Sequence, residues 1–176
     1  MITYEEAEKL LEEKGCSKEV IEHCRRVSLK AGEIAEKIVA NGHEVNAALA
    51  MIGGLLHDIG RCRTNDVNHG VEGGKIVWAM GEEELARIVE RHVGGGIKAG
   101  EVEGFPEKDF MPETLEEKIV CYADKLVEEM PDGTMKENED ASREIAKLEG
   151  KFGKEHPAPQ RLKKIQDEIK GLTGKG

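Results

Sequence analysis

The chain has 176 residues and a mass of 19.4 kDa, which is room for one domain of ordinary size. Its 26 Lys and Arg residues against 36 Asp and Glu give a formal net charge of −10, which opposes binding to DNA, RNA or an anionic membrane. Aromatic residues make up 3% of the chain, so the stacking side chains of single-strand nucleic-acid binders are scarce. We therefore expect an aliphatic core and no nucleic-acid polymer as a partner.

The cysteines and the hydropathy pattern indicate a protein of the cytoplasm. Cys16, Cys24, Cys62 and Cys121 form no Cys-x-x-Cys pair, which favours reduced thiols over a zinc knuckle or a thioredoxin-like site. The N-terminal residues are acidic and lack the pattern of a signal peptide. The apolar stretch 47–56 is far shorter than the roughly 20 residues that span a bilayer. We expect a cytoplasmic protein without a membrane contact.

Helical periodicity dominates the sequence and no strand alternation stands out, so we predict an all-α fold. In chain order, helices are expected at about 5–14, 17–42, 44–56, 69–80, 82–93, 113–130, 134–152 and 159–171. Ser17 is the predicted N-cap of the second helix. The third helix is apolar around its whole circumference, which predicts a central position with burial on every side.

Breaks in the pattern indicate how the chain is organised. Pro131-Asp132-Gly133 ends the sixth helix, so we expect a main domain over 1–133, with its core at about 17–130. Residues 134–176 would form a C-terminal helical extension packed on the same domain. The irregular segment 97–112 follows three consecutive glycines and is a candidate to cover or gate a site. The basic C-terminal part is expected to pack on the acidic body or on a second subunit, so a homo-oligomer is possible.

Polar groups interrupt the apolar faces of three separate helices. His23, His92 and Asp124 each lie three or four residues from predicted buried aliphatic residues. His57 and Asp58 end the most buried helix. A single histidine at such a position is most often a hydrogen-bonded core residue. A buried carboxylate, however, costs several kcal/mol unless it is paired or bound to metal, and the set taken jointly predicts a metal site.

The donor types limit the metal without fixing it. Imidazoles suit Zn, Mn, Fe, Co or Ni, and the added carboxylates, which also admit Mg, favour an open catalytic site over a closed structural one. His43 and His156 lie beside turn signals and are expected to be exposed residues outside the site. No Gly-x-Ser-x-Gly or Walker motif is present in the sequence.

The order of these residues resembles the HD-domain superfamily of metal-dependent phosphohydrolases. The series is His23, His57-Asp58, His69, His92 and Asp124, it spans about 20–130, and His57-Asp58-Ile59-Gly60 matches the HDIG variant. His23-Cys24-Arg25-Arg26 and Tyr122-Ala123-Asp124-Lys125 resemble the beginning and end of the family pattern. The segments around His69 and His92 are similar to bacterial dinucleoside tetraphosphatases. The segments around His92 and 112–119 are similar to an archaeal group of HDIG proteins whose substrate is unassigned.

The resemblance implies a helical bundle with two divalent ions between its core helices. His23, His57, Asp58 and Asp124 would hold one ion, and Asp58 would bridge to a second ion held by His69 and His92. Water activated by the metal would then attack a phosphoester or phosphoanhydride bond of a small nucleotide-like substrate.

Nearby cations are the predicted phosphate-binding residues. Arg26, Arg61 and Lys125 would hold the phosphate and steady developing charge, and Arg63 is a further candidate; each could equally be a surface ion-pair residue.

Two other functions stay open. Some HD-fold proteins with a similar ligand set are mixed-valent di-iron oxygenases, and ligand type alone does not fix the metal. A non-catalytic, metal-containing regulatory module is the third possibility, although all six ligand positions are filled here.

Overall fold

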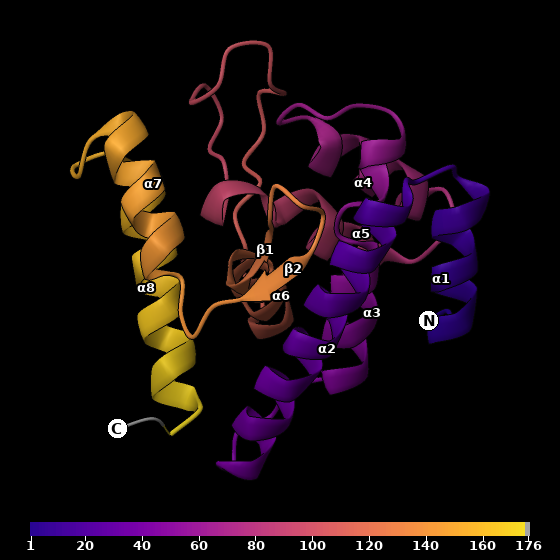
Figure 1. Cartoon of the computed structure of the whole chain (residues 1–176), viewed down its shortest axis with the longest axis horizontal. Coiled ribbons are helices and arrows are strands. Elements are labelled where there is room, and N and C mark those ends of the chain that lie inside the picture. Colours follow the sequence, from indigo (N-terminus) through magenta and orange to yellow (C-terminus); the bar gives the residue numbers. More distant parts are fainter. Residues whose placement is uncertain (175–176) are drawn as a thin grey trace.

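The computed structural model describes residues 1–174, which form a helical bundle with one small β-hairpin (Figure 1). The α-helices are α1 (Tyr4–Glu13), α2 (Lys18–Ala40), α3 (Ala47–Leu56), α4 (His69–Trp78), α5 (Glu83–Arg91), α6 (Leu115–Leu126), α7 (Ser142–Phe152) and α8 (Pro157–Leu172). Two short 3₁₀ helices, η1 (Ile59–Cys62) and η2 (Val93–Gly95), follow α3 and α5. The predicted all-α class is confirmed. None of the helices within residues 1–174 has the length and apolar character to cross a membrane.

Several helices begin at a residue whose side chain accepts a hydrogen bond from a free backbone N–H group. Ser17 caps α2 as predicted, because its side chain accepts a hydrogen bond from the backbone nitrogen of Val20. Asn46 caps α3 in the same way, so this helix begins at Ala47, three residues after the expected start at 44. Thr3 and Thr114 each form a capping box, with Glu6 and Glu117 respectively.

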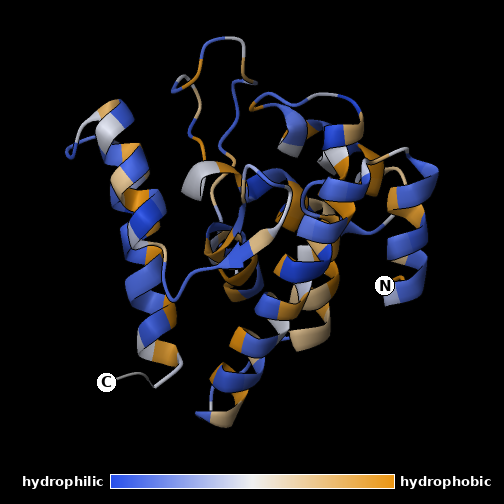
Figure 2. Cartoon of the chain, viewed as in Figure 1, coloured by the Kyte–Doolittle hydropathy of each residue, from blue (hydrophilic) through white to orange (hydrophobic). Residues whose placement is uncertain are grey.

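The core lies between α2, α3 and α6, and α3 is its centre. Leu55 and Leu56 have no exposed surface, in line with the predicted central position of this helix. α2 and α3 approach closely at Gly54, where a Cβ would lie 3.0 Å from the Cα of Ser28. Figure 2 shows hydrophilic and hydrophobic residues alternating around α2, as expected of a helix with one buried face.

The C-terminal helix α8 packs on this core. Leu162, Ile165 and Ile169 belong to the same buried cluster as the residues of α2, α3 and α6. Lys118 of α6 donates to Glu168 of α8 at 2.8 Å. The basic C-terminal part therefore contacts the acidic body within the same chain. The last two residues of the expected 134–176 extension lie outside the described structure.

Residues 127–137 form a hairpin, and here the sequence prediction was wrong. The helix expected to reach 130 ends at Leu126, and the helix expected from 134 begins at Ser142; between them β1 (Val127–Glu129) pairs antiparallel with β2 (Met135–Glu137). Asp132 stabilises the turn by accepting from the backbone nitrogen of Thr134 at 3.0 Å. Strands of three residues are too short to give a visible period of two, so the turn residues suggested only a helix stop.

The segment 97–112 projects from the body at the top of Figure 1 and carries its own small core. A β-bridge joins Ile97 to Phe110, and these two residues pack with Phe105 and Val71. Arg161 of α8 holds the base of the segment, since it donates to the carbonyl oxygen of Gly96 and to Glu101, each at 2.8 Å. The segment contributes no residue to the pocket described below, and its role in covering or gating a site stays a prediction.

Candidate metal centre

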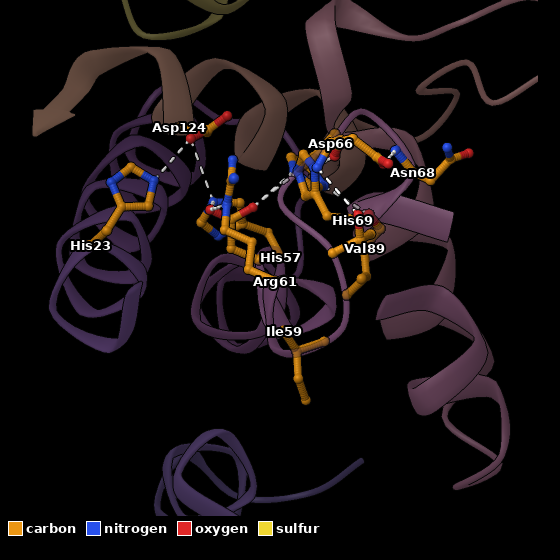
Figure 3. A network of polar contacts seen from close by, with 12 residues as sticks. His23, His57, Ile59, Arg61, Asp66, Asn68, His69, Val89 and Asp124 are labelled. Carbon is orange, nitrogen blue, oxygen red and sulfur yellow. Dashed lines mark hydrogen bonds and ion pairs between the residues drawn. The ribbon is translucent and has the colours of Figure 1, made fainter. Parts of the chain in front are cut away.

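Six histidine and aspartate side chains from five helices meet at one place. His23 lies on α2 and Asp124 on α6, whereas the other four stand at helix ends. These four are His57 at the end of α3, Asp58 directly after it, His69 at the start of α4 and His92 at the end of α5. Figure 3 shows the labelled side chains in a row from His23 through His57 to His69. The fold thus brings together the residues predicted as ligands.

One group of donor atoms surrounds Asp124. Its Oδ1 lies 3.0 Å from Nε2 of His23 and 3.4 Å from Nε2 of His57. Nε2 of His57 lies in turn 3.6 Å from Oδ2 of Asp58. This is the first of the two predicted ligand sets.

A second group surrounds the other oxygen of Asp58. Oδ1 lies 3.1 Å from Nε2 of His69 and 3.5 Å from Nε2 of His92, and these two nitrogens are 3.1 Å apart. Asp58 is therefore shared, with one oxygen towards each group. This is the arrangement predicted for a bridging carboxylate.

Backbone carbonyls fix which nitrogen of each buried histidine faces the cluster. Nδ1 of His57, His69 and His92 lies 2.7, 2.6 and 2.7 Å from the carbonyl oxygens of Gly54, Asp66 and Val89. A carbonyl only accepts, so each Nδ1 carries the hydrogen and donates it. The Nε2 atom, which points at the aspartates, is left to hold either a proton or a metal ion.

The two aspartates are ionised in this environment. Burial alone would raise the pKa of Asp58, but the charge of His57 outweighs it and holds the pKa well below its usual range. For Asp124, burial is outweighed by the charge of Lys125 and by a hydrogen bond from His23, and the pKa again lies well below its usual range. Ionised carboxylates are the form that binds metal.

The pKa values of two buried histidines, His92 and His57, are shifted in opposite directions. Burial lowers the pKa of His92 to about 4, so this imidazole is neutral at pH 7. Burial acts in the same direction on His57, but the adjacent charge of Asp58 outweighs it and raises the pKa well above its ordinary value. A bound cation would replace the proton that His57 otherwise carries.

The geometry fits a divalent metal ion. Nε2 of His57 and Oδ1 of Asp58 are buried, and no hydrogen bond from the described residues reaches either atom. Such atoms are costly in a protein interior unless something satisfies them. Donor atoms bound to one ion at about 2.1 Å lie about 3.0 to 3.4 Å apart. The donor separations of 3.0 to 3.6 Å are close to that range.

Part of the cluster lines a pocket of about 560 Å³. His23, Asp58 and Asp124 line it together with two cations, Arg61 and Lys125. Nε of Arg61 lies 2.5 Å from Oδ2 of Asp58, and Nζ of Lys125 contacts Oδ2 of Asp124. Two of the predicted phosphate-binding residues thus stand directly beside the aspartates.

The other two predicted cations do not reach the pocket. Arg26 is exposed and its Nε donates to Glu22 of the same helix at 3.0 Å. Arg63 donates to Glu72 at 3.0 Å and is half exposed. Arg26 follows His23 by three residues, which puts both on one side of α2, but its side chain extends along the helix to Glu22 rather than into the pocket. The expectation that these two arginines belong to the site is corrected accordingly.

The two remaining histidines lie away from the cluster. His43 is exposed, as expected. His156 is half-buried rather than exposed, because its Nδ1 accepts from the backbone nitrogen of Ala158 and so caps α8.

The residues of the far wall of the pocket were not predicted from the sequence. This wall contains Asn138, Arg143, Glu144 and Lys147, from the end of the hairpin and from α7. From the sequence, these residues are indistinguishable from solvent-exposed residues of a charged helix. Charge and periodicity do not reveal which exposed helix face lies opposite a binding site. Only the tertiary packing of α7 brings them there.

Comparison with known proteins identifies the family. The model of the HD domain family matches residues 20–129. Uncharacterised protein MJ0778 of Methanocaldococcus jannaschii is 47% identical over 160 residues, which cover 89% of this chain and 91% of that protein. The tRNA (cytidine(56)-2'-O)-methyltransferase of Picrophilus torridus is 36% identical over 161 residues, covering 89% of this chain but 43% of the methyltransferase.

A solved structure supports the fold. The HD domain of the L. monocytogenes phosphodiesterase PgpH, crystallised with cyclic-di-AMP, superposes with a TM-score of 0.54 over 97% of this chain and 98% of that one. Its sequence identity is 17%, so the likeness concerns the arrangement of helices. Taken with the match over residues 20–129, these findings show that the chain belongs to the HD domain family.

Proposed function

We propose that this protein is a metal-dependent phosphohydrolase that cleaves a phosphoester or phosphoanhydride bond of a small, nucleotide-like substrate. The observation that carries the proposal is the position of Asp58, which lines the pocket and whose two oxygens face two histidine-containing donor groups. A divalent ion bound there would polarise a phosphoryl oxygen and lower the pKa of a bound water. PgpH, which has the same fold, is a phosphodiesterase, in keeping with this reaction class.

Each of the six candidate ligands has a role in this proposal. His23, His57 and Asp124 would hold one ion, His69 and His92 would hold a second, and Asp58 would contribute to both. Asp58 is 4% exposed and His57 fully buried, so these ligands are screened from bulk water on all sides but the pocket. That screening strengthens their interaction with a cation.

Arg61 and Lys125 contribute positive charge at the same end of the pocket. They would bind the phosphate and stabilise the charge that develops on its oxygens during attack. The nucleophile is water rather than a side chain. Among the residues of the described chain that line the pocket, Ser17 carries the single hydroxyl, and its oxygen is engaged in capping α2.

The test is metal analysis followed by phosphate release from a panel of nucleotides and phosphoesters with Mn, Mg, Co, Ni, Zn and Fe. Asp58→Ala and Asp124→Ala are expected to abolish hydrolysis, whereas Asp167→Ala, an exposed aspartate of α8, leaves it unchanged. Hydrolysis that survives in both of the first two variants contradicts the mechanism. Oxygen consumption by the iron-loaded protein, without phosphate release from any compound, would identify an oxygenase instead.

A further inference from the structure

At the inner end of the pocket, each of the two aspartates is paired with a cation. Asp58 pairs with Arg61, and Asp124 pairs with Lys125. Bound divalent ions would therefore give this end a net positive charge. A phosphoryl group is attracted to it for that reason.

The outer end of the pocket has the opposite character. Its charged lining residues are four carboxylates and two cations: Glu19, Glu128, Glu129, Glu144, Arg143 and Lys147. Four negative charges against two positive ones leave a formal charge of −2. The pocket lining thus combines these outer residues, which have excess negative charge, with the candidate metal ligands, where bound ions would supply positive charge.

The two outer cations are already engaged by carboxylates. Nζ of Lys147 lies 3.1 Å from Oε1 of Glu128 and 3.5 Å from Oε2 of Glu144. Nε of Arg143 lies 3.4 Å from Oε2 of Glu128. Arg143 and Lys147 therefore do not form a free clamp for a second phosphate, because a phosphate would have to compete with Glu128 for both.

The remaining lining groups suit a neutral partner that offers hydrogen-bond donors. The carboxylate oxygens accept hydrogen bonds from hydroxyl groups, and the amides of Asn65 and Asn138 both donate and accept. Of the described residues that line the pocket, Val20 and Val127 are the apolar ones, and none is Phe, Tyr or Trp. A large apolar or stacked group has little to contact here.

We infer that the substrate is the monophosphate ester of an uncharged, hydroxyl-rich alcohol, such as a sugar or a ribose group. The single phosphate binds at the inner end and the hydroxyl groups face the outer carboxylates. A second phosphoryl group, which carries about −1.5 to −2 charges at pH 7, is repelled by the excess carboxylates. Glu128 is the specificity-determining residue, because it neutralises Arg143 and Lys147. The inference rests on the proposed function and narrows its substrate class.

Two matched pairs of compounds test this inference with the Mn²⁺-loaded protein. They are fructose 6-phosphate against fructose 1,6-bisphosphate, and adenosine 5′-monophosphate against adenosine 3′,5′-bisphosphate. In each pair we expect kcat/KM to be about tenfold higher or more for the monophosphate. The preference should weaken as salt is added, because exposed charges are screened.

Substitutions at Glu128 test whether this residue causes the preference for monophosphates. Glu128→Gln, which frees both cations, is expected to reduce the monophosphate preference about tenfold, whereas Glu128→Asp retains it. Glu149→Gln is the matched control, since Glu149 lies on α7 but does not line the pocket. An unchanged preference in Glu128→Gln would mean that the outer carboxylates do not select the substrate.

Measuring how tightly the four compounds bind distinguishes failure of this inference from failure of the proposed function. Absence of metal-dependent phosphate release from all four compounds and from the wider panel contradicts the hydrolase assignment. Calorimetric titration of the same pairs tests the charge argument whether or not they are cleaved. Equal or tighter binding of a bisphosphate than of its monophosphate overturns the inference.

Discussion

Gly60 lies against the backbone of His69, and no larger residue fits between them. A Cβ on Gly60 would overlap the carbonyl oxygen of His69 and lie 2.5 Å from the backbone nitrogen of Gly73. Both obstacles belong to the backbone of α4, so a rotamer change cannot relieve them. The glycine of the His57-Asp58-Ile59-Gly60 segment therefore sets how closely one ligand, His69, approaches the turn that carries another, Asp58.

Gly60→Ala is expected to lower the free energy of unfolding by about 2 to 4 kcal/mol, because α4 must move away from η1. Gly150→Ala is the matched control: its Cβ would meet nothing within 4 Å, and alanine in a helix is favoured over glycine by up to about 1 kcal/mol. Urea denaturation of both variants measures the difference. Equal stability of the two would show that α4 can shift at little cost.

The number of bound ions should follow the two donor groups. His69→Gln removes a ligand from the second group alone, so metal analysis after dialysis against Mn²⁺ should find about one ion fewer per chain than in the unmodified protein. Asp58→Asn weakens both groups and should lose more metal than His69→Gln. If the two variants retain the same amount of metal, Asp58 does not serve both groups.

The arginines that follow Asp58 provide a comparison within the same short segment. Arg61 lines the pocket and contacts Asp58, whereas Arg63 pairs with Glu72 outside it. Arg61→Gln is expected to lower kcat/KM about a hundredfold, since it removes a cation beside the phosphate. Arg63→Gln and Arg26→Gln should stay within about twofold. A loss in Arg63→Gln as large as that in Arg61→Gln contradicts the pocket assignment.

Asp140 gives the fold a predicted response to acid. Hydrogen bonds from Lys170 and from Ser142 lower the pKa of Asp140 to about 2, below the value of about 3.9 in an unfolded chain. The stability it contributes is thus present above pH 4 and lost as the pH falls towards 2. Both side chains are about one-third exposed, so the contribution is at most about 1 kcal/mol.

Asp140→Asn removes the charge but keeps an oxygen for the Ser142 backbone nitrogen. The difference in urea midpoint between this variant and the unmodified chain should be constant from pH 8 to pH 5 and vanish near pH 2. A difference that persists at pH 2 would mean that packing, not charge, is responsible.

The sequence predicted the helices and the ligand cluster for the same physical reason. Buried faces leave a period of 3.6 residues in the sequence, and a polar group such as His23 or Asp124 on such a face stands out against it. The distances within the cluster lie beyond sequence reasoning, because they depend on how five helices meet. Whether these residues hold metal stays a prediction.

What the sequence did not predict depends on long-range packing or on very short elements. The hairpin at 127–137 has too few residues for an alternation pattern. Arg143 and Lys147 reach the pocket because α7 lies beside the hairpin, some 20 residues after Asp124, and nothing in their local sequence records this. Arg26 likewise lies outside the pocket because its side chain leaves α2 in a direction a few tens of degrees away from that of His23.

Because α8 is attached near His92, the part of the chain needed for folding extends beyond the part that contains the candidate ligands. Leu162 packs against Gly95, and Arg161 binds the carbonyl oxygen of Gly96, three and four residues after His92. A protein shortened to the family match at 20–129 would keep all six candidate ligands. It would nevertheless lose the helix that supports the backbone beside one of them, together with the far wall of the pocket, formed by Asn138, Arg143, Glu144 and Lys147. The positions of the candidate ligands therefore do not show where this chain can be truncated without loss of its structure.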